Sequence, residues 1–228
     1  MRPRRLVSIT TAVLIVALLA GCSVPSASTP PHQVLPAAPS PSQVPSPAPT
    51  PEIPAAIVLR GDSIELTSAD GQLVERVPFS QGTSSVAAAV RSLLGPSVSS
   101  TSPIACSDST VHEEKWGDAL SIANYGDLFG YLNATAASYH GIAIETPGKS
   151  SVGSAASAIV ADIPSAVTYD STIANASYVW YDLGPGANGK GKSGVMVYSN
   201  IGLGTITSIF TPSVYFPNPD SSYNGGDC

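Results

Sequence analysis

The chain has 228 residues, of which 43% are hydrophobic and only 11% are charged. Its 16 acidic residues outnumber its 10 basic ones, which gives a net charge of −6. So few Lys and Arg residues argue against nucleic acid as a partner, because binding to a polyphosphate needs clustered positive charge.

The N-terminus has the charge and hydropathy pattern of a secretory leader. Residues 1–5 include three arginines, residues 6–20 are mostly apolar, and Leu19-Ala20-Gly21-Cys22 closes the segment with small residues and a cysteine. The apolar stretch is shorter than the roughly 20 residues that a membrane span needs. A membrane-spanning anchor and a plain secretory signal are the alternatives to a cleaved lipoprotein leader.

The leader resembles the signal of bacterial lipoproteins through its Leu-Ala-Gly-Cys run. The resemblance implies that Cys22 receives a diacylglyceryl group, that the signal peptide of residues 1–21 is removed, and that the protein stays on the extracytoplasmic face of the cell membrane. Two acyl chains are enough for stable anchoring. Removal of residues 1–21 takes away three basic residues and no acidic one, so the net charge becomes −9.

Residues 22–55 are predicted to form a tether that has no core of its own. Proline occurs in it at positions 25, 30, 31, 36, 39, 41, 45, 47, 49, 51 and 54. Because proline fixes φ and lacks an N–H, this segment favours polyproline II and serves as a spacer of about 3 Å per residue. The alternative, a ligand for SH3-type domains, conflicts with the expected location, since those domains are cytosolic.

The remaining cysteines, Cys106 and Cys228, are predicted to form one disulfide. The outside of the membrane is oxidising, and no third cysteine competes once Cys22 is lipidated. Such a bridge would hold the C-terminal residue, which would otherwise fray. Two free thiols are the alternative.

Residues 56–228 are predicted to form one α+β domain that opens with a β-hairpin. Apolar alternation over residues 57–67 and again over residues 73–79 flanks the turn signal Asp70-Gly71. Ser84-Ser85 is expected to cap a helix over residues 87–94, and Gly95-Pro96 to end it.

An internal repeat follows, with copies at about residues 80–140 and 146–211. We expect each copy to be a helix followed by an antiparallel meander, with the helices on one face of the sheet. The second helix is expected over residues 153–161, and the second copy carries an insertion at residues 184–194. Chance similarity in a chain of low residue diversity is the alternative. The matching runs are Gly82-Thr83-Ser84-Ser85-Val86 with Gly148-Lys149-Ser150-Ser151-Val152, Trp116-Gly117-Asp118 with Trp180-Tyr181-Asp182, and residues 119–124 with residues 195–200.

This order of leader, tether and two helix-then-meander copies resembles lipoproteins of actinobacteria. Over about residues 80–215 it also resembles, in topology, the tandem-repeat proteins typified by β-lactamase inhibitory protein and the BamE-type lipoprotein module. The resemblance implies a protein-binding surface on an open sheet face, and no contact residue is carried over from those families. The candidates in this chain are aromatic side chains, for which burial in the core is the alternative: Trp116, Tyr178, Trp180, Tyr181 and Tyr198.

A Walker A pattern runs from Gly186 to Ser193. Phosphate binding by this motif needs a helix after the loop, whereas the residues that follow here predict a strand. We therefore expect a hairpin loop at this place and no nucleotide partner.

The chain has three histidines that could take part in chemistry. His32 lies in the tether, and His112 with Glu114 supplies two metal ligands where a site needs three or four. His140 has no serine at a spacing typical of a hydrolase. The sequence predicts no enzyme, no metal and no cofactor, and it favours a surface lipoprotein that binds an envelope protein as an adaptor or inhibitor. A carrier for a small apolar or envelope ligand is the alternative function.

Overall fold

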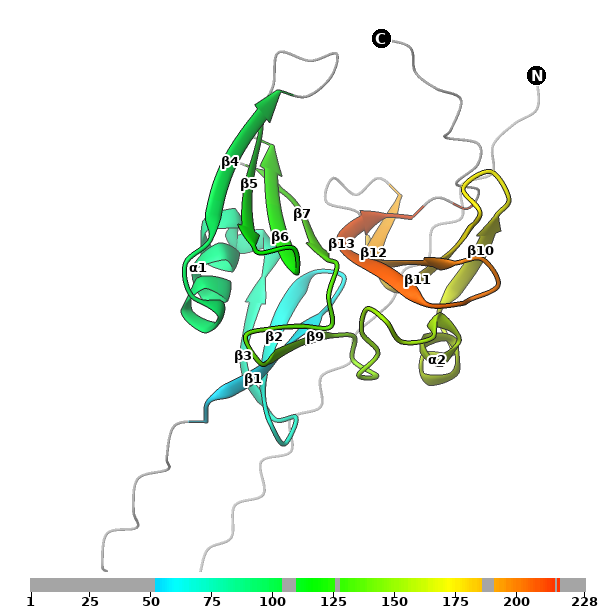
Figure 1. The fold of residues 1–228 in the computed structure, drawn as a ribbon, viewed down its shortest axis with the longest axis horizontal. Helices are drawn as coiled ribbons and strands as arrows, with labels where there is room; N and C mark the ends of the chain where they lie inside the picture. Colours follow the sequence, from blue (N-terminus) through cyan, green and yellow to red (C-terminus); the bar gives the residue numbers. More distant parts are fainter. Residues whose placement is uncertain (1–51, 104–109, 126–127, 186–190, 216, 218–228) are drawn as a thin grey trace, which may run out of the picture. The chain divides into compact units, whose positions relative to one another are not determined.

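The computed structural model describes residues 52–103, 110–125, 128–185, 191–215 and 217 (Figure 1). The leader, Cys22, His32 and most of the tether lie outside this described part, as do both Cys106 and Cys228. Among the described residues, no helix is long and apolar enough to cross a membrane.

The α+β prediction is confirmed. The described residues form two α-helices, a mixed sheet of five strands and an antiparallel sheet of eight strands. The helices are α1 (Thr83–Leu94) and α2 (Ala156–Asp162), and a short 3₁₀ turn covers Phe79–Gln81. The strands are β1 (Pro54–Leu59), β2 (Ser63–Ser68), β3 (Leu73–Pro78), β4 (Val98–Pro103), β5 (Thr110–Trp116), β6 (Leu120–Tyr125), β7 (Leu128–Ala134), β8 (Ser138–Tyr139), β9 (Ile142–Glu145), β10 (Val167–Ser171), β11 (Ala176–Pro185), β12 (Lys192–Asn200) and β13 (Ile206–Val214).

The five-stranded sheet is larger than the hairpin expected from the sequence. Its order is β3-β2-β1-β9-β8, so the first three strands form a meander and β1 also pairs in parallel with β9. The β9 strand has only four residues and lies far along the chain. Sequence alternation near residue 57 therefore gave no sign that β1 would be flanked on both sides.

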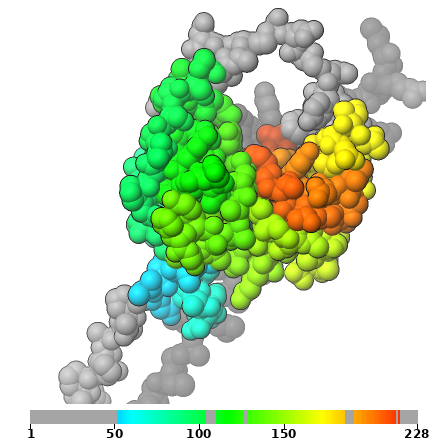
Figure 2. Space-filling view, in the orientation of Figure 1, coloured from blue at the N-terminus to red at the C-terminus, as the bar shows by residue number. Residues whose placement is uncertain are grey.

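The eight-stranded sheet has the order β10-β11-β12-β13-β7-β6-β5-β4. The four strands that follow α1 pair with one another in chain order, and so do the four that follow α2. The last strands of the two sets, β7 and β13, pair with each other and so connect the two sets into one sheet. Phe210 lies opposite Asn133 at the centre of this pair. The green and orange segments meet at this seam in the space-filling view (Figure 2).

The ladder register is the same on both sides of this seam, and it corrects the residue matches made from sequence. Asn133 pairs with Ser121 on one side, and Phe210 pairs with Met196 on the other. Further out, Trp116 pairs with Leu120. The corresponding pair in the second set is Tyr181 with Val195. Trp116 therefore corresponds to Tyr181 and not to Trp180, because the sequence match is one residue out.

A similar slip affects the expected match of residues 119–124 with residues 195–200. Leu120 lies opposite Trp116, and Val195 lies opposite Tyr181, so the ladder position of Leu120 is that of Val195 and not of Met196. A slip of one residue sends every side chain of a strand to the other face of the sheet. In this register Leu120 and Val195 both face the core, whereas the sequence match would pair Leu120 with the outward-facing Met196.

The helices also begin later or earlier than expected. Gly82 precedes the first residue of α1, so Ser84 and Ser85 lie in its first turn and neither is the cap. Gly95 ends this helix as predicted, with φ of 84° and its N–H bonded to the carbonyl of Arg91. The second helix starts only at Ala156, because Gly153 has a φ of 91°, a left-handed conformation that a helix does not contain.

One apolar core lies between the inner face of the eight-stranded sheet and the layer made of the five-stranded sheet and the helices. Its largest fully buried side chain from β5 is Trp116, and that from β11 is Tyr181. The other buried members include Ile57, Leu59, Ile64, Leu66, Val86, Val90, Leu120, Ile122, Leu132, Ile144, Ile159, Val179, Val195, Val197, Ile206 and Ile209. Because this core takes up one face of the eight-stranded sheet, the opposite face is left for other contacts.

Candidate interaction surface

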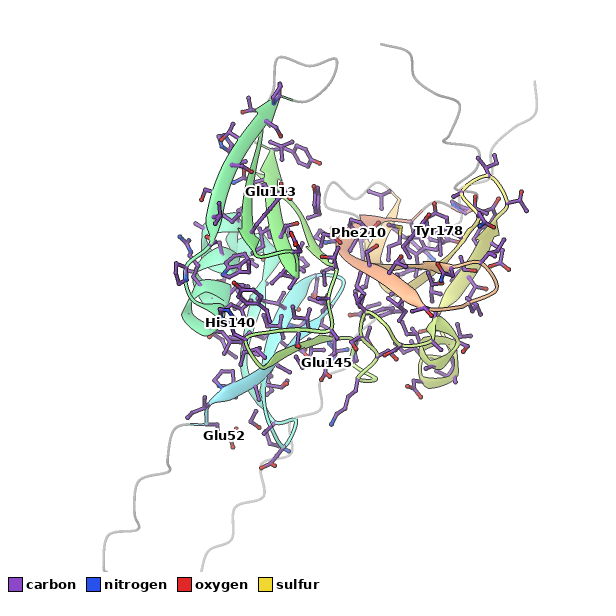
Figure 3. All side chains as sticks on the ribbon, viewed as in Figure 1. Glu52, Glu113, His140, Glu145, Tyr178 and Phe210 are labelled. Carbon is purple, nitrogen blue, oxygen red and sulfur yellow. The ribbon has the colours of Figure 1, made fainter. Side chains whose placement is uncertain are left out.

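The outer face of the eight-stranded sheet is the face opposite the core. Side chains alternate along each strand, and the register aligns the outward positions into rows across the sheet. Figure 3 labels three of these positions, which are Glu113, Phe210 and Tyr178. The outer face comprises Val98, Ser100, Glu113, Lys115, Ser121, Ala123, Tyr131 and Asn133 in the first half, and Val167, Tyr169, Tyr178, Trp180, Met196, Tyr198, Ser208 and Phe210 in the second.

Four aromatic rings of the second half pack together, and we call them the aromatic cluster: Tyr178, Trp180, Tyr198 and Tyr215. The rings of Tyr178 and Trp180 are stacked with centroids 5.6 Å apart. Tyr198 meets Tyr178 edge-on at 5.2 Å, and Tyr215 meets Trp180 edge-on at 5.4 Å. Tyr198 and Tyr215 are half-buried, whereas Tyr178 and Trp180 are buried. The cluster therefore has a buried base and a partly exposed rim.

A second aromatic group lies at the centre of the sheet. Tyr131 meets Phe210 at 6.3 Å and Tyr125 at 6.4 Å, so ring contacts cross from the first half to the second. Burial raises the pKa of Tyr131, the negative charge of Glu113 raises it further, and Lys115 opposes the rise. Glu113 and Lys115 form an ion pair of 3.0 Å on the same face.

The two tryptophans have different environments. The Nε1 of Trp116 donates a hydrogen bond of 2.9 Å to the carbonyl of Gly95, where α1 ends. The Nε1 of Trp180 is buried and has no acceptor among the described residues, although the side chain is only 1% exposed. A buried donor without an acceptor carries a free-energy cost that the hydrogen-bonded indole of Trp116 does not.

The structure separates the five aromatic residues that the sequence proposed for an interaction surface. Tyr178, Trp180 and Tyr198 lie together on the outer face. Trp116 and Tyr181 face the core instead, because strand alternation points them the other way, and they are 0% and 1% exposed. The hydroxyl of Tyr181 donates to the carbonyl of Leu59 at 3.3 Å, and burial, with Asp182 adding to it, raises the pKa of this tyrosine well above its ordinary value.

Sequence reasoning missed several outer-face residues. Phe210, Met196 and Tyr131 lie on this face, and Tyr215 joins it from the residue after β13. Simple alternation along residues 206–214 would place Phe210 on the same face as Ile206. The irregular pairing of this strand with β12 changes that phase, so that Ile206 and Ile209 face the core and Phe210 faces outward. No local signal indicates the ring contacts, because they depend on which strands become neighbours.

His112 and His140 both contact neighbouring side chains of the fold. His112 and Glu114 share one face of β5, as expected from strand spacing, but His112 bonds to the hydroxyl of Thr101 at 2.9 Å and Glu114 accepts from Ser97 at 2.7 Å. His140 has a φ of 50° and stacks on Tyr139 at 4.0 Å. No three His, Cys, Asp or Glu side chains gather as a metal site within the described residues.

The end of the Walker-like run is described, whereas residues 186–190 lie outside the described part. Lys192 and Ser193 begin β12. A strand therefore follows the loop, as the sequence predicted, and the helix N-terminus that would hold a phosphate in this motif is not there.

An open groove of about 1460 Å³ lies where the turns of the five-stranded sheet approach β11 and β12. Gly61 lies so close to β11 that a Cβ atom there would be 2.4 Å from the carbonyl oxygen of Asp182. Two ion pairs line the groove, Arg60 with Glu65 at 3.0 Å and Arg76 with Asp62 at 2.9 Å. Burial raises the pKa of Asp62, but hydrogen bonds from Ser63 and Arg76 and the charge of Arg76 outweigh it and leave the pKa below its usual value.

Comparison with known proteins adds no family assignment. No protein-family model, no curated protein and no solved structure matches this chain. The function is therefore inferred from the side chains of the outer face and the groove, together with the N-terminal sequence.

Proposed function

We propose that this chain is a lipid-anchored lipoprotein on the extracytoplasmic face of the cell membrane and that it acts by binding a protein. The outer face of the eight-stranded sheet is the binding surface. The N-terminal sequence supports the anchor, with Cys22 as the lipidated residue, and the proline-rich tether supports a domain held away from the membrane. In this proposal the chain is an adaptor or inhibitor and has no catalytic role.

The observation that carries the proposal is the concentration of aromatic side chains on one half of the outer face. Aromatic residues and methionine are enriched in protein interfaces, and Trp and Tyr account for much of the binding energy there. Tyr198, Met196 and Phe210 are half-buried on this face, so each can lose further exposed area to a partner. The buried Trp180 beneath them gives the surface a rigid base.

We also propose that the sheet arose from two copies of a helix-plus-meander module. The support is the ladder register, which pairs equivalent strands in the same way on both sides of the β7–β13 seam. The tandem-repeat families that the sequence resembles bind protein on an open sheet face, and the proposal extends that expectation to this chain. That expectation supports the choice of the outer face over the loops or the helices.

The proposal is tested by a photo-crosslinking amino acid placed at Tyr198, in the full chain expressed on its native cells. We expect one protein to be crosslinked from this position in an amount close to that of the chain itself. The matched control is the same probe at Ile173, which is 64% exposed but belongs to the turn between β10 and β11. If the two positions capture the same proteins, or neither captures any, the outer face is not a protein-binding surface.

The anchor is tested separately by replacing Cys22 with Ala. We expect the variant to leave the membrane fraction, because the acyl chains can no longer be attached. A matched replacement of Ser23 with Ala should leave the protein on the membrane. Membrane retention of the Cys22→Ala variant would contradict the lipoprotein assignment.

The groove favours a second candidate, a binding module for a small envelope ligand. Its lining combines apolar rings and prolines, such as Phe79, Phe129 and Pro212, with two ion pairs, so it suits an amphipathic molecule better than a purely apolar one. Native mass spectrometry of the protein released from membranes tests this candidate. A bound small molecule that is lost in an Arg76→Ala variant would support it, and an empty protein would contradict it.

A further inference from the structure

The aromatic cluster contains an unused hydrogen-bond donor. The Nε1 of Trp180 is buried, and the described residues offer it no acceptor. The rings of Tyr178 and Tyr215 pack on this indole, so the donor lies inside an aromatic surrounding. A ligand that fits this place must therefore bring an acceptor, such as a carbonyl oxygen, together with apolar surface for the rings.

The centre of the second half of the outer face also lacks charge. None of the eight positions named above for this half carries Asp, Glu, Lys, Arg or His, whereas the first half holds the ion pair of Glu113 and Lys115. Lys192 lies on the same side of β12 as Met196, but at the first residue of the strand, four residues before it. Charged segments would lose their hydration here without gaining a partner charge. The surface is thus complementary to an uncharged segment.

We propose that the aromatic cluster binds the proline-rich segment, residues 23–51, of a second copy of this chain. This segment has ten prolines, one histidine and no charged residue. A polyproline II helix makes no internal hydrogen bonds, so its carbonyl groups are free to accept from Trp180. Aromatic-lined grooves are the usual docking place for such helices, because the ligand loses little conformational entropy on binding. The inference rests on the proposed function and names the partner of the same surface.

The length of the segment and its location make this contact feasible. Its 29 residues lie directly before the first described residue, Glu52, and would span about 90 Å as a polyproline II helix of about 3.1 Å per residue. A tether of this reach would let the folded domain of one copy contact the segment of a neighbouring copy anchored to the same membrane. Anchoring also raises the effective concentration, so a weak contact is sufficient.

Binding requires one rearrangement. Trp180 is only 1% exposed and the Tyr215 ring lies against it, so the peptide must displace this ring to reach the indole. Tyr215 follows β13 and its backbone N–H bonds to the carbonyl of Lys192 at 2.8 Å. This bond holds the backbone of Tyr215, so the proposed rearrangement moves its side chain.

The experiment follows the two indole N–H signals by NMR in the full chain, labelled with nitrogen-15 and carrying alanine at the ten proline positions of residues 23–51. A synthetic peptide of the native residues 23–51 is added up to about 1 mM, the order of effective concentration that tethering supplies. We expect the Trp180 signal to shift and that of Trp116, which already donates to Gly95, to stay. The control peptide has alanine for every proline and should shift neither signal.

Two variants measured by calorimetry make the result specific. Trp180→Phe retains an aromatic ring but removes the donor, so we expect binding about two- to tenfold weaker. Tyr198→Ala removes a half-buried rim ring and should also weaken binding, which covers the case that Trp180→Phe does not fold. Unchanged affinity in both variants, or no shift of the Trp180 signal at saturating peptide, would overturn the inference.

The crosslink at Tyr198 separates this inference from the proposed function. A crosslinked fragment from residues 23–51 of a second copy supports both. A crosslink to a different protein retains the protein-binding function but overturns the second copy as the partner. No crosslink together with a peptide-induced shift would leave the peptide site in place and contradict the function on native cells.

Discussion

The two halves of the eight-stranded sheet have the same ladder but different outer faces. Six pairs of equivalent outer positions differ in character: Lys115 and Trp180, Glu113 and Tyr178, Ser121 and Met196, Ala123 and Tyr198, Asn133 and Phe210, and Ser100 and Tyr169. In these six, a small or polar side chain of the first half corresponds to a large aromatic or apolar one in the second. Two pairs do not follow this trend, since Val98 corresponds to Val167 and Tyr131 to Ser208. An outer face is not fixed by the core, so one half can specialise without changing the fold.

The inner faces of the same halves are alike. Leu120 corresponds to Val195 and Ile122 to Val197, and all four are at most 1% exposed. Close packing of the core penalises a change of volume on this side, so apolar character is retained in both halves. The comparison teaches that the inner face determines the fold, while the outer face of the second half is where function is to be sought.

The largest expected effect comes from removing the core tryptophan of the first half. Trp116→Ala should lower the free energy of unfolding by about 3–5 kcal/mol, because it leaves a cavity in a close-packed core. Urea denaturation of the full chain measures this loss. The control is Lys115→Ala, one residue away on the outer face, which should have a much smaller effect because the side chain is half exposed. Equal losses in the two variants would show that the faces are not distinct.

A finer test compares the two tryptophans with the same substitution. Trp116→Phe removes the hydrogen bond to Gly95 and leaves that carbonyl without its donor, whereas Trp180→Phe removes a donor that has no acceptor. We therefore expect Trp116→Phe to cost about 1 kcal/mol more than Trp180→Phe in urea denaturation. A larger cost for Trp180→Phe would mean that its indole nitrogen has a partner in solution.

Much of this comparison could be predicted from the sequence. The α+β class and the strand after the Walker-like run followed from alternation, and the end of the first helix followed from Gly95. These features depend on residues close in the chain, where a period of two or a left-handed glycine has a direct structural meaning.

The sequence could not show which side of a strand faces the core. Matching Trp116 with Trp180 by letter identity placed two residues together that lie on opposite faces of the sheet. That match relied on the identical residue type and not on the period of two along a strand. A shift of one residue moves every side chain of a strand to the other face of the sheet. The parallel pairing of β9 with β1 and the β7–β13 seam were also beyond reach, because both join segments far apart in the chain.

The smallest expected effect concerns Glu113 and Lys115, the ion pair of the first half, whose equivalent positions in the second half are aromatic. Burial raises the pKa of Tyr131, Glu113 raises it further and Lys115 lowers it. Glu113→Gln should therefore move this pKa down towards its ordinary value, while Lys115→Gln should move it up. Titration of the Tyr131 ring signals by NMR measures both shifts.

The sign of the linked change in stability follows from the same pKa. A tyrosine whose pKa is raised on folding holds its proton more tightly in the folded chain, so stability falls as the pH rises from the ordinary value of 10.0 through the folded pKa. Glu113→Gln should weaken this fall above pH 10, and Lys115→Gln should steepen it. If both variants shift the pKa of Tyr131 in the same direction, the charges of Glu113 and Lys115 do not control this pKa. The charge difference between the two halves of the outer face would then have no measurable electrostatic effect on Tyr131.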